Sequence, residues 1–173
     1  MPENYTIREV QDYWISAWHG TKYNCLESIA EIGLKPAGGI LKDGSENQVC
    51  VSHIGRQVVI DEIPDWANGI FVSPSIFYCS HPAYAKEITS NNEQWKVFVE
   101  VRVKPDSYIV HGSTCPKYVP KKGEPEKLEY RVAAENESDV QVVSLSFVKS
   151  EFFSKVNNYS EGEFLEINNN QIY

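Results

Sequence analysis

The chain has 173 residues, of which 42% are hydrophobic, so it is long enough for one domain with a substantial core. Its formal net charge of -8 makes a nucleic-acid partner less favoured, because such binders usually carry a basic face. No apolar run approaches membrane-spanning length, and residues 1–4 lack the start of a secretory signal. We therefore expect an intracellular protein, cytoplasmic or nuclear, without a membrane partner, whose four scattered cysteines are free thiols.

The first part of the chain predicts a short buried strand at 14–18, a tight polar turn through His19-Gly20-Thr21, and then an amphipathic helix. Asn24 is expected to cap this helix in a capping box, and Gly33 to end it. Residues 36–68 are rich in turn formers, which is typical of a functional loop, apart from a candidate strand at 58–60.

The second part is richer in strands. A strand is expected at 69–73, followed by a helix that Ser80 or His81 caps and that runs to about Ile88. Alternating valines predict a half-buried strand at 95–103. Further strands are expected at 107–110, 128–133 and 140–148, and the tail 157–173 is acidic and polar. Early helices and late strands favour an α+β domain with mainly antiparallel sheets over residues 1–173.

Three separated blocks of this sequence resemble one known family. They are Trp-His-Gly-Thr at 18–21 with Gly33-Leu34 behind it, Gly69-Ile70-Phe71 followed by Ala83-Tyr84, and Glu129-Tyr130-Arg131-Val132. In this order, residues 14–148 resemble the catalytic domain of the poly(ADP-ribose) polymerase-like ADP-ribosyltransferases of the His-Tyr-Glu type. The resemblance implies two packed, mainly antiparallel sheets with a few short helices. It also implies NAD as substrate, cleaved at the nicotinamide–ribose bond, with ADP-ribose passed to an acceptor.

The resemblance assigns roles to residues of the first and third blocks. His19 would bind a ribose hydroxyl, Gly20 would offer its backbone to the nicotinamide amide, and Thr21 would add a hydroxyl. Glu129 would be the catalytic carboxylate that supports the oxocarbenium-like transition state. Each of these residues also has a plain structural interpretation, such as a satisfied buried histidine or a solvated strand glutamate. We expect a protein acceptor and mono-transfer, although chain-elongating enzymes can share this glutamate.

In the second block, Tyr84 would stack on nicotinamide, and Phe71 stands where the family usually has its signature tyrosine, a departure that bears on NAD binding. Ser80 is our candidate for the serine that binds the carboxamide, in a local register that the sequence leaves open. Lys35 matches a basic residue near the adenosine end of NAD. Arg56 in the 36–68 loop is a further candidate cation without a motif behind it.

Several alternatives stay open at this point. The chain could be a non-catalytic module of the same fold or an NAD glycohydrolase, and less plausibly an RNA-end phosphotransferase, which would need clustered Arg and His. His-Gly-Ser-Thr at 111–114 looks like a copy of the first motif and is interpreted as a turn after a strand. Cys50-x-x-His53 with Cys79-x-His81 could in principle hold zinc, but the spacing is not that of a usual zinc knuckle, so no metal is expected.

Overall fold

The computed structural model describes residues 13–48, 62–115 and 118–155. The strands are β1 (Ile15–Thr21), β2 (Gly69–Val72), β3 (Ile88–Ser90), β4 (Glu93–Val103), β5 (Tyr108–His111), β6 (Glu129–Ala133) and β7 (Val140–Lys149). The helices are α1 (Leu26–Ile32), α2 (Ile76–Cys79) and α3 (Ser150–Lys155), with the 3-10 helices η1 (Tyr23–Cys25) and η2 (Ala134–Asp139). The chain is therefore α+β, as the sequence predicts.

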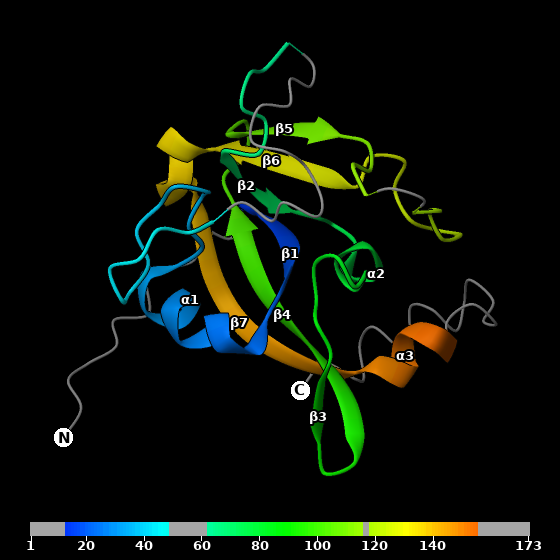
Figure 1. Cartoon of the computed structure of the whole chain (residues 1–173). Coiled ribbons are helices and arrows are strands. Elements are labelled where there is room, and N and C mark those ends of the chain that lie inside the picture. The colour runs from blue at the N-terminus through cyan, green and yellow to red at the C-terminus, as the bar shows by residue number, and fades with distance from the viewer. Residues whose placement is uncertain (1–12, 49–61, 116–117, 156–173) are drawn as a thin grey trace.

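The strands form two antiparallel sheets (Figure 1). In the larger sheet the long strand β4 pairs with β7 along one edge and with β1 and β3 along the other. The smaller sheet has the order β2-β6-β5. The two sheets join where the backbone of Trp18 exchanges two hydrogen bonds with that of Ser73, at N···O distances of 2.7 and 2.8 Å. This junction brings the end of β1 next to β2.

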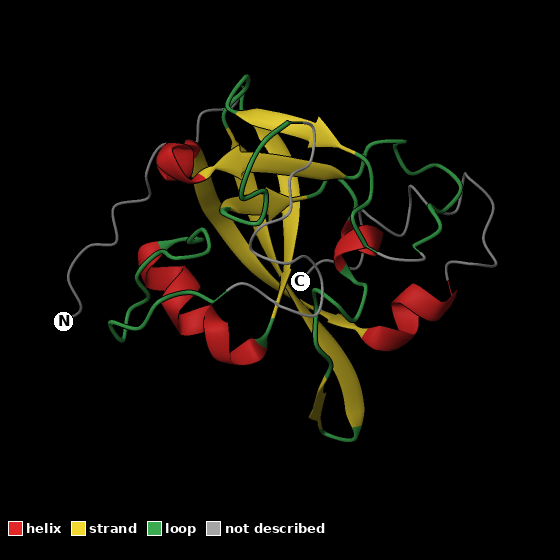
Figure 2. Ribbon diagram, turned by 45° about the horizontal axis from the view of Figure 1, so that its top comes forward, coloured by secondary structure: helices red, strands yellow, loops and turns green. Residues whose placement is uncertain are grey.

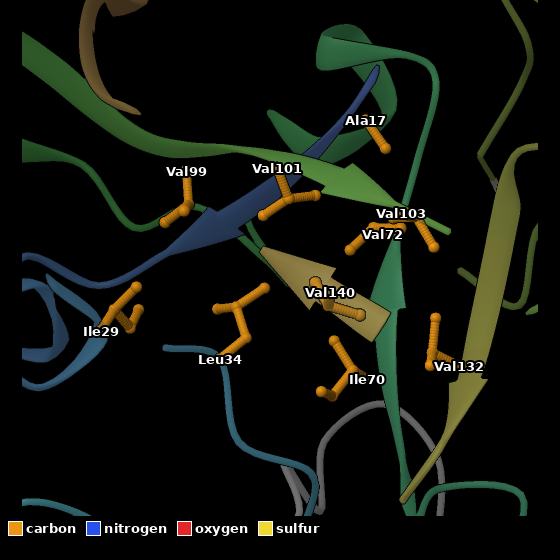
Figure 3. Close-up of a cluster of buried hydrophobic side chains, with 10 residues drawn as sticks. All are labelled: Ala17, Ile29, Leu34, Ile70, Val72, Val99, Val101, Val103, Val132 and Val140. Carbon is orange, nitrogen blue, oxygen red and sulfur yellow. The ribbon is translucent and has the colours of Figure 1, made fainter. Parts of the chain in front are cut away.

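The main core lies between the sheets and α1. It consists of ten buried apolar side chains from both sheets, α1 and the segment after it: Ala17, Ile29, Leu34, Ile70, Val72, Val99, Val101, Val103, Val132 and Val140 (Figure 3). The alternating valines of β4 fill this core, as expected for side chains two residues apart on one face. Phe98 points to the opposite face, where it packs with side chains of α2 and α3. Both faces of β4 are thus covered, and the helices flank the sheets (Figure 2).

Two local predictions are wrong. The first strand does not end in a turn at 18–21, because β1 continues through Thr21 in register with Val97 of β4. Asn24 does not cap α1, since it lies inside η1 and the residue at the N-cap position is Cys25. The expected glycine stop is confirmed, because Gly33 ends α1 with a φ of 77°, in the left-handed region that favours glycine.

The predicted helix from Ser80 to about Ile88 is also wrong. The helix in this region, α2, comes earlier and is capped by Ser75, whose Oγ accepts a hydrogen bond from the Tyr78 N–H. After α2 the chain makes a turn in which the carbonyl of His81 accepts from Tyr84 and Ala85. All four residues of α2 are buried, so its sequence carries no amphipathic pattern that periodicity could detect.

The predicted strands after residue 68 are confirmed within a few residues as β2, β4, β5, β6 and β7. The candidate strand at 58–60, Arg56, Cys50, His53 and the tail 157–173 lie outside the described residues. Among the helices that are described, none has the length and apolarity that crossing a bilayer requires.

Candidate active site

A carboxylate is buried at the start of β6. Glu129 is 2% exposed, and its Oε1 accepts hydrogen bonds from three hydroxyl groups. They are those of Tyr78, of Tyr84 at 3.0 Å and of Thr114 at 2.6 Å. Its second oxygen, Oε2, is buried and has no hydrogen-bond partner among the residues that the structure describes. A buried carboxylate oxygen without a hydrogen-bond donor destabilises the protein. A hydroxyl group of a ligand could supply the donor that Oε2 lacks.

The three hydroxyls come from separate parts of the chain. Tyr78 lies on α2 and Tyr84 in the turn after it, whereas Thr114 follows β5. The pairing of His111 with Glu129 in the β5–β6 ladder places the 111–114 segment beside the carboxylate. No motif in the sequence points to Tyr78, and the pattern at 111–114 predicts a turn. The His-Gly pair, present at 19–20 and again at 111–112, is the one signal near Thr114.

The imidazole of His19 is fixed by a backbone carbonyl. Its Nδ1 lies 2.8 Å from the carbonyl oxygen of Phe71 on β2. Since a carbonyl can only accept, Nδ1 carries the hydrogen and the neutral ring keeps Nε2 as an acceptor. Burial lowers the pKa of His19, and the bond to Phe71 opposes this shift only in part. The ring is therefore set up as a neutral hydrogen-bond acceptor.

Gly20 lacks a side chain for a reason internal to the protein. A Cβ at this position would stand 2.3 Å from the carbonyl oxygen of Cys79 and 3.1 Å from the Cβ of Tyr84. The end of α2 and the following turn thus pack directly on the backbone of β1. The thiol of Cys79 donates to the carbonyl of Trp18 at 3.2 Å, and burial raises the pKa of this thiol to about 12. The close approach at Gly20 positions Tyr84 against Glu129.

Phe71 lies on the wall formed by β2 and β6. It pairs with Arg131 in the ladder, so both side chains share a face of the small sheet with Glu129. The indole of Trp66 packs over this face, with ring centroids 6.1 Å from Phe71, and the Arg131 guanidinium lies 5.2 Å from the indole centroid. Arg131 also donates to the carbonyls of Trp66 and Asn68, at 2.8 and 3.2 Å. Arg131 therefore holds the segment before β2 in place.

Part of this site borders a cavity of about 720 Å³, a size typical of small-molecule sites. Of the residues that the sequence singles out, it is lined by His19, Gly20, Thr21, Lys35, Phe71, Tyr84 and Glu129. Ser80 does not line it. The Ser80 side chain is buried and donates to the carbonyl of Phe77 at 2.7 Å, because it sits at the C-cap of α2.

Two of the three lysines that line the cavity carry carboxylate partners. Lys35 forms an ion pair with Glu137 of η2, and Lys42 pairs with Glu27 and Glu31 of α1 at 2.6 and 2.5 Å. Like Lys22, both paired lysines line the cavity. An anionic ligand group would have to share these cations with the glutamates.

No cluster of three or more potential metal ligands occurs in the part of the chain that is described. Of the proposed zinc ligands, Cys79 and His81 are described. The Cys79 thiol donates to the carbonyl of Trp18, and Nδ1 of His81 lies 3.2 Å from Sγ of Cys115.

A comparison of the chain with protein-family models, with curated proteins and with solved structures found no match.

Proposed function

We propose that this chain is an NAD-dependent ADP-ribosyltransferase that transfers single ADP-ribose units to a protein acceptor. The observation that carries the proposal is that His19, Tyr84 and Glu129, which come from three separate parts of the chain, line one cavity, and that Oε2 of Glu129 has no hydrogen-bond donor among the described residues. His19 and Glu129 stand at the histidine and glutamate positions of the His-Tyr-Glu transferases that the sequence resembles. Tyr84 matches their stacking tyrosine, and Phe71 replaces their signature tyrosine. The coarse α+β architecture with two antiparallel sheets is consistent with that fold.

The reaction requires a negatively charged group beside the positive charge that develops on the ribose. When the bond between ribose C1′ and the nicotinamide nitrogen breaks, the electron pair leaves with the ring and C1′ acquires oxocarbenium character. Glu129 would accept a hydrogen bond from a ribose hydroxyl through Oε2, to which no residue in the described ranges donates. Its negative charge, buried at 2% exposure, would stabilise the developing positive charge more than a solvated carboxylate could.

The acceptor completes the reaction. Its nucleophilic atom forms a bond to C1′ and loses a proton, and with water in its place the same step is hydrolysis. Of the described carboxylates that line the cavity, Glu129 is the candidate for the base that accepts this proton. Glu27 is paired with Lys42, and Asp43 is the next residue after Lys42 in the sequence.

His19 and Tyr84 would hold the substrate. The neutral His19 ring offers Nε2 to a hydroxyl of the second ribose, because Nδ1 is engaged by Phe71. The Tyr84 ring lines the cavity next to Glu129, where it can pack on a flat nicotinamide. Lys35 would meet the pyrophosphate by exchanging its partner Glu137 for a phosphate oxygen.

A transfer assay tests this proposal. The protein is incubated with adenine-labelled NAD and cell extract, and the products are treated with protease or nuclease. We expect protease-sensitive label with the wild type and its loss in His19→Gln and Glu129→Gln. Label removed by nuclease would contradict a protein acceptor. Nicotinamide release without transferred label would identify a glycohydrolase, and absence of NAD binding in calorimetry would identify a non-catalytic module.

A further inference from the structure

The hydroxyl groups around Glu129 are distributed unequally between its two oxygens. Tyr78, Tyr84 and Thr114 all donate to Oε1, and no group of the described chain donates a hydrogen bond to Oε2. A carboxylate that served packing alone would gain more from donors on both oxygens, because each unsatisfied buried oxygen is costly. The asymmetry fixes the orientation of the carboxylate and leaves one oxygen for a ligand.

The direction of the hydrogen bonds follows from the neighbours of Tyr78. Its hydroxyl oxygen accepts from Oγ of Ser113 at 3.2 Å and from the Cys115 N–H at 3.4 Å, and it lies 2.8 Å from the Tyr84 hydroxyl, where either oxygen can be the donor. Since a carboxylate oxygen can only accept, the one hydrogen of the phenol is donated to Glu129. Desolvation and the nearby Glu129 charge raise the pKa of Tyr78, so the phenol keeps this hydrogen. The 113–115 segment therefore orients Tyr78 as a donor.

The same segment provides the Thr114 hydroxyl. Thr114 Oγ1 is 2.6 Å from Oε1, and the ladder pair of His111 with Glu129 anchors the start of the segment. In the described part of the chain these hydroxyl dipoles, rather than a paired cation, surround the charge of Glu129.

We propose that Tyr78 and Thr114 are positioning residues for Glu129, which hold Oε1 so that Oε2 is presented to a sugar hydroxyl of the substrate. This inference rests on the proposed function and extends it to two residues that line no part of the cavity themselves. They act through Glu129 on the reaction, and their hydroxyl groups, not their bulk, carry the effect.

Substitutions that remove a hydroxyl while keeping the shape test this role. We expect Tyr78→Phe and Thr114→Val each to lower kcat for nicotinamide release by roughly 10- to 100-fold, with KM for NAD changed by less than about threefold. Thr114→Ser retains the hydroxyl and is expected to keep kcat within about threefold of the wild type. Urea unfolding of each variant shows whether it is folded under the assay conditions. Tyr78→Phe and Thr114→Val each remove one donor to Oε1, so they test the role of this oxygen independently. Unchanged kcat in both hydroxyl-free variants would overturn the positioning role while leaving the transferase proposal intact.

A second measurement needs no NAD. The infrared carboxylate bands that Glu129→Gln removes belong to Glu129, and we expect Thr114→Val to shift them and Thr114→Ser to leave them in place. A protein that does not cleave NAD but shows this shift would overturn the proposed function and retain the contacts at Oε1. Bands that Thr114→Val leaves unshifted would overturn the positioning role, whether or not NAD is cleaved.

Discussion

His19 on β1 donates a hydrogen bond of 2.8 Å from Nδ1 to the carbonyl of Phe71 on β2, and so joins the two sheets at the cavity. This bond lies next to the backbone bridge between Trp18 and Ser73. The imidazole is thus part of the junction between the sheets as well as of the cavity wall. Its protonation state consequently links the stability of the fold to the site.

Stability is expected to depend on pH through His19. Its folded-state pKa is below the ordinary value of 6.5, so below pH 6.5 the unfolded chain binds more protons than the folded one. This contribution is full above pH 6.5 and is lost as pH falls, by at most about 1.4 kcal/mol per pH unit. Urea unfolding between pH 7.5 and about 5 should show a shallower pH dependence in His19→Asn than in the wild type. The same pH dependence of the unfolding free energy in His19→Asn and in the wild type would contradict this role of His19.

A side chain at position 20 should destabilise the protein. In Gly20→Ala the new Cβ would lie 2.3 Å from the Cys79 carbonyl, so β1 or the 79–85 segment must move. We expect a loss of about 1–3 kcal/mol in the free energy of unfolding. Gly112→Ala is the matched control, because nothing lies within 4 Å of its Cβ. Equal stability of the two variants in urea unfolding would show that the contact at Gly20 is not tight.

Arg131 should contribute to stability rather than to binding. It is 6% exposed, and Arg131→Met would leave the carbonyls of Trp66 and Asn68 without their donors. We expect a loss of about 2–4 kcal/mol in unfolding free energy, since each buried acceptor left unpaired costs about 1–3 kcal/mol. Arg102→Met is the control, because Arg102 forms a partly exposed pair with Glu100, which should contribute less than about 1 kcal/mol. A similar loss in both variants would argue against this role.

Lys35 should affect NAD affinity more than stability. Its pair with Glu137 is partly exposed, so Lys35→Met should change the unfolding free energy by less than about 1 kcal/mol. If the lysine meets the pyrophosphate, the Kd for NAD in calorimetry should rise about tenfold. Lys104→Met removes a lysine whose partner is Asp139 and which does not line the cavity, and serves as control. An unchanged Kd would remove Lys35 from the binding site.

The sequence predicts the strands of this fold better than its helices. The alternation from Val97 to Val103 specifies a strand because β4 is long enough for the pattern to repeat. The four buried residues of α2 hold no such repeat, so the local pattern points to a cap at Ser80 or His81 and gives no sign of the cap at Ser75. The extension of β1 through Thr21 depends on pairing with β4, a non-local contact that local turn preferences do not report.

The candidate site shows the same contrast between features with a local sequence pattern and features that depend on long-range contacts. His19, Phe71, Tyr84 and Glu129 are placed on one cavity, as the spacing of the motifs suggests. The sequence does not reveal that Tyr78 and Thr114 donate to Glu129, because a hydroxyl that bonds a distant carboxylate leaves no periodic pattern in the chain. Ser80 was chosen by sequence register alone, and its hydroxyl is used to cap the end of α2.

Nicotinamide release from NAD, compared between the wild type, Glu129→Gln and Glu126→Gln, tests the central claim most directly. Glu126 is an exposed glutamate in the same segment and controls for loss of charge. We predict that Glu126→Gln releases nicotinamide as the wild type does and that Glu129→Gln is slower by about 100-fold or more. Equal release by Glu129→Gln and the wild type would contradict the assignment of this carboxylate as the catalytic group.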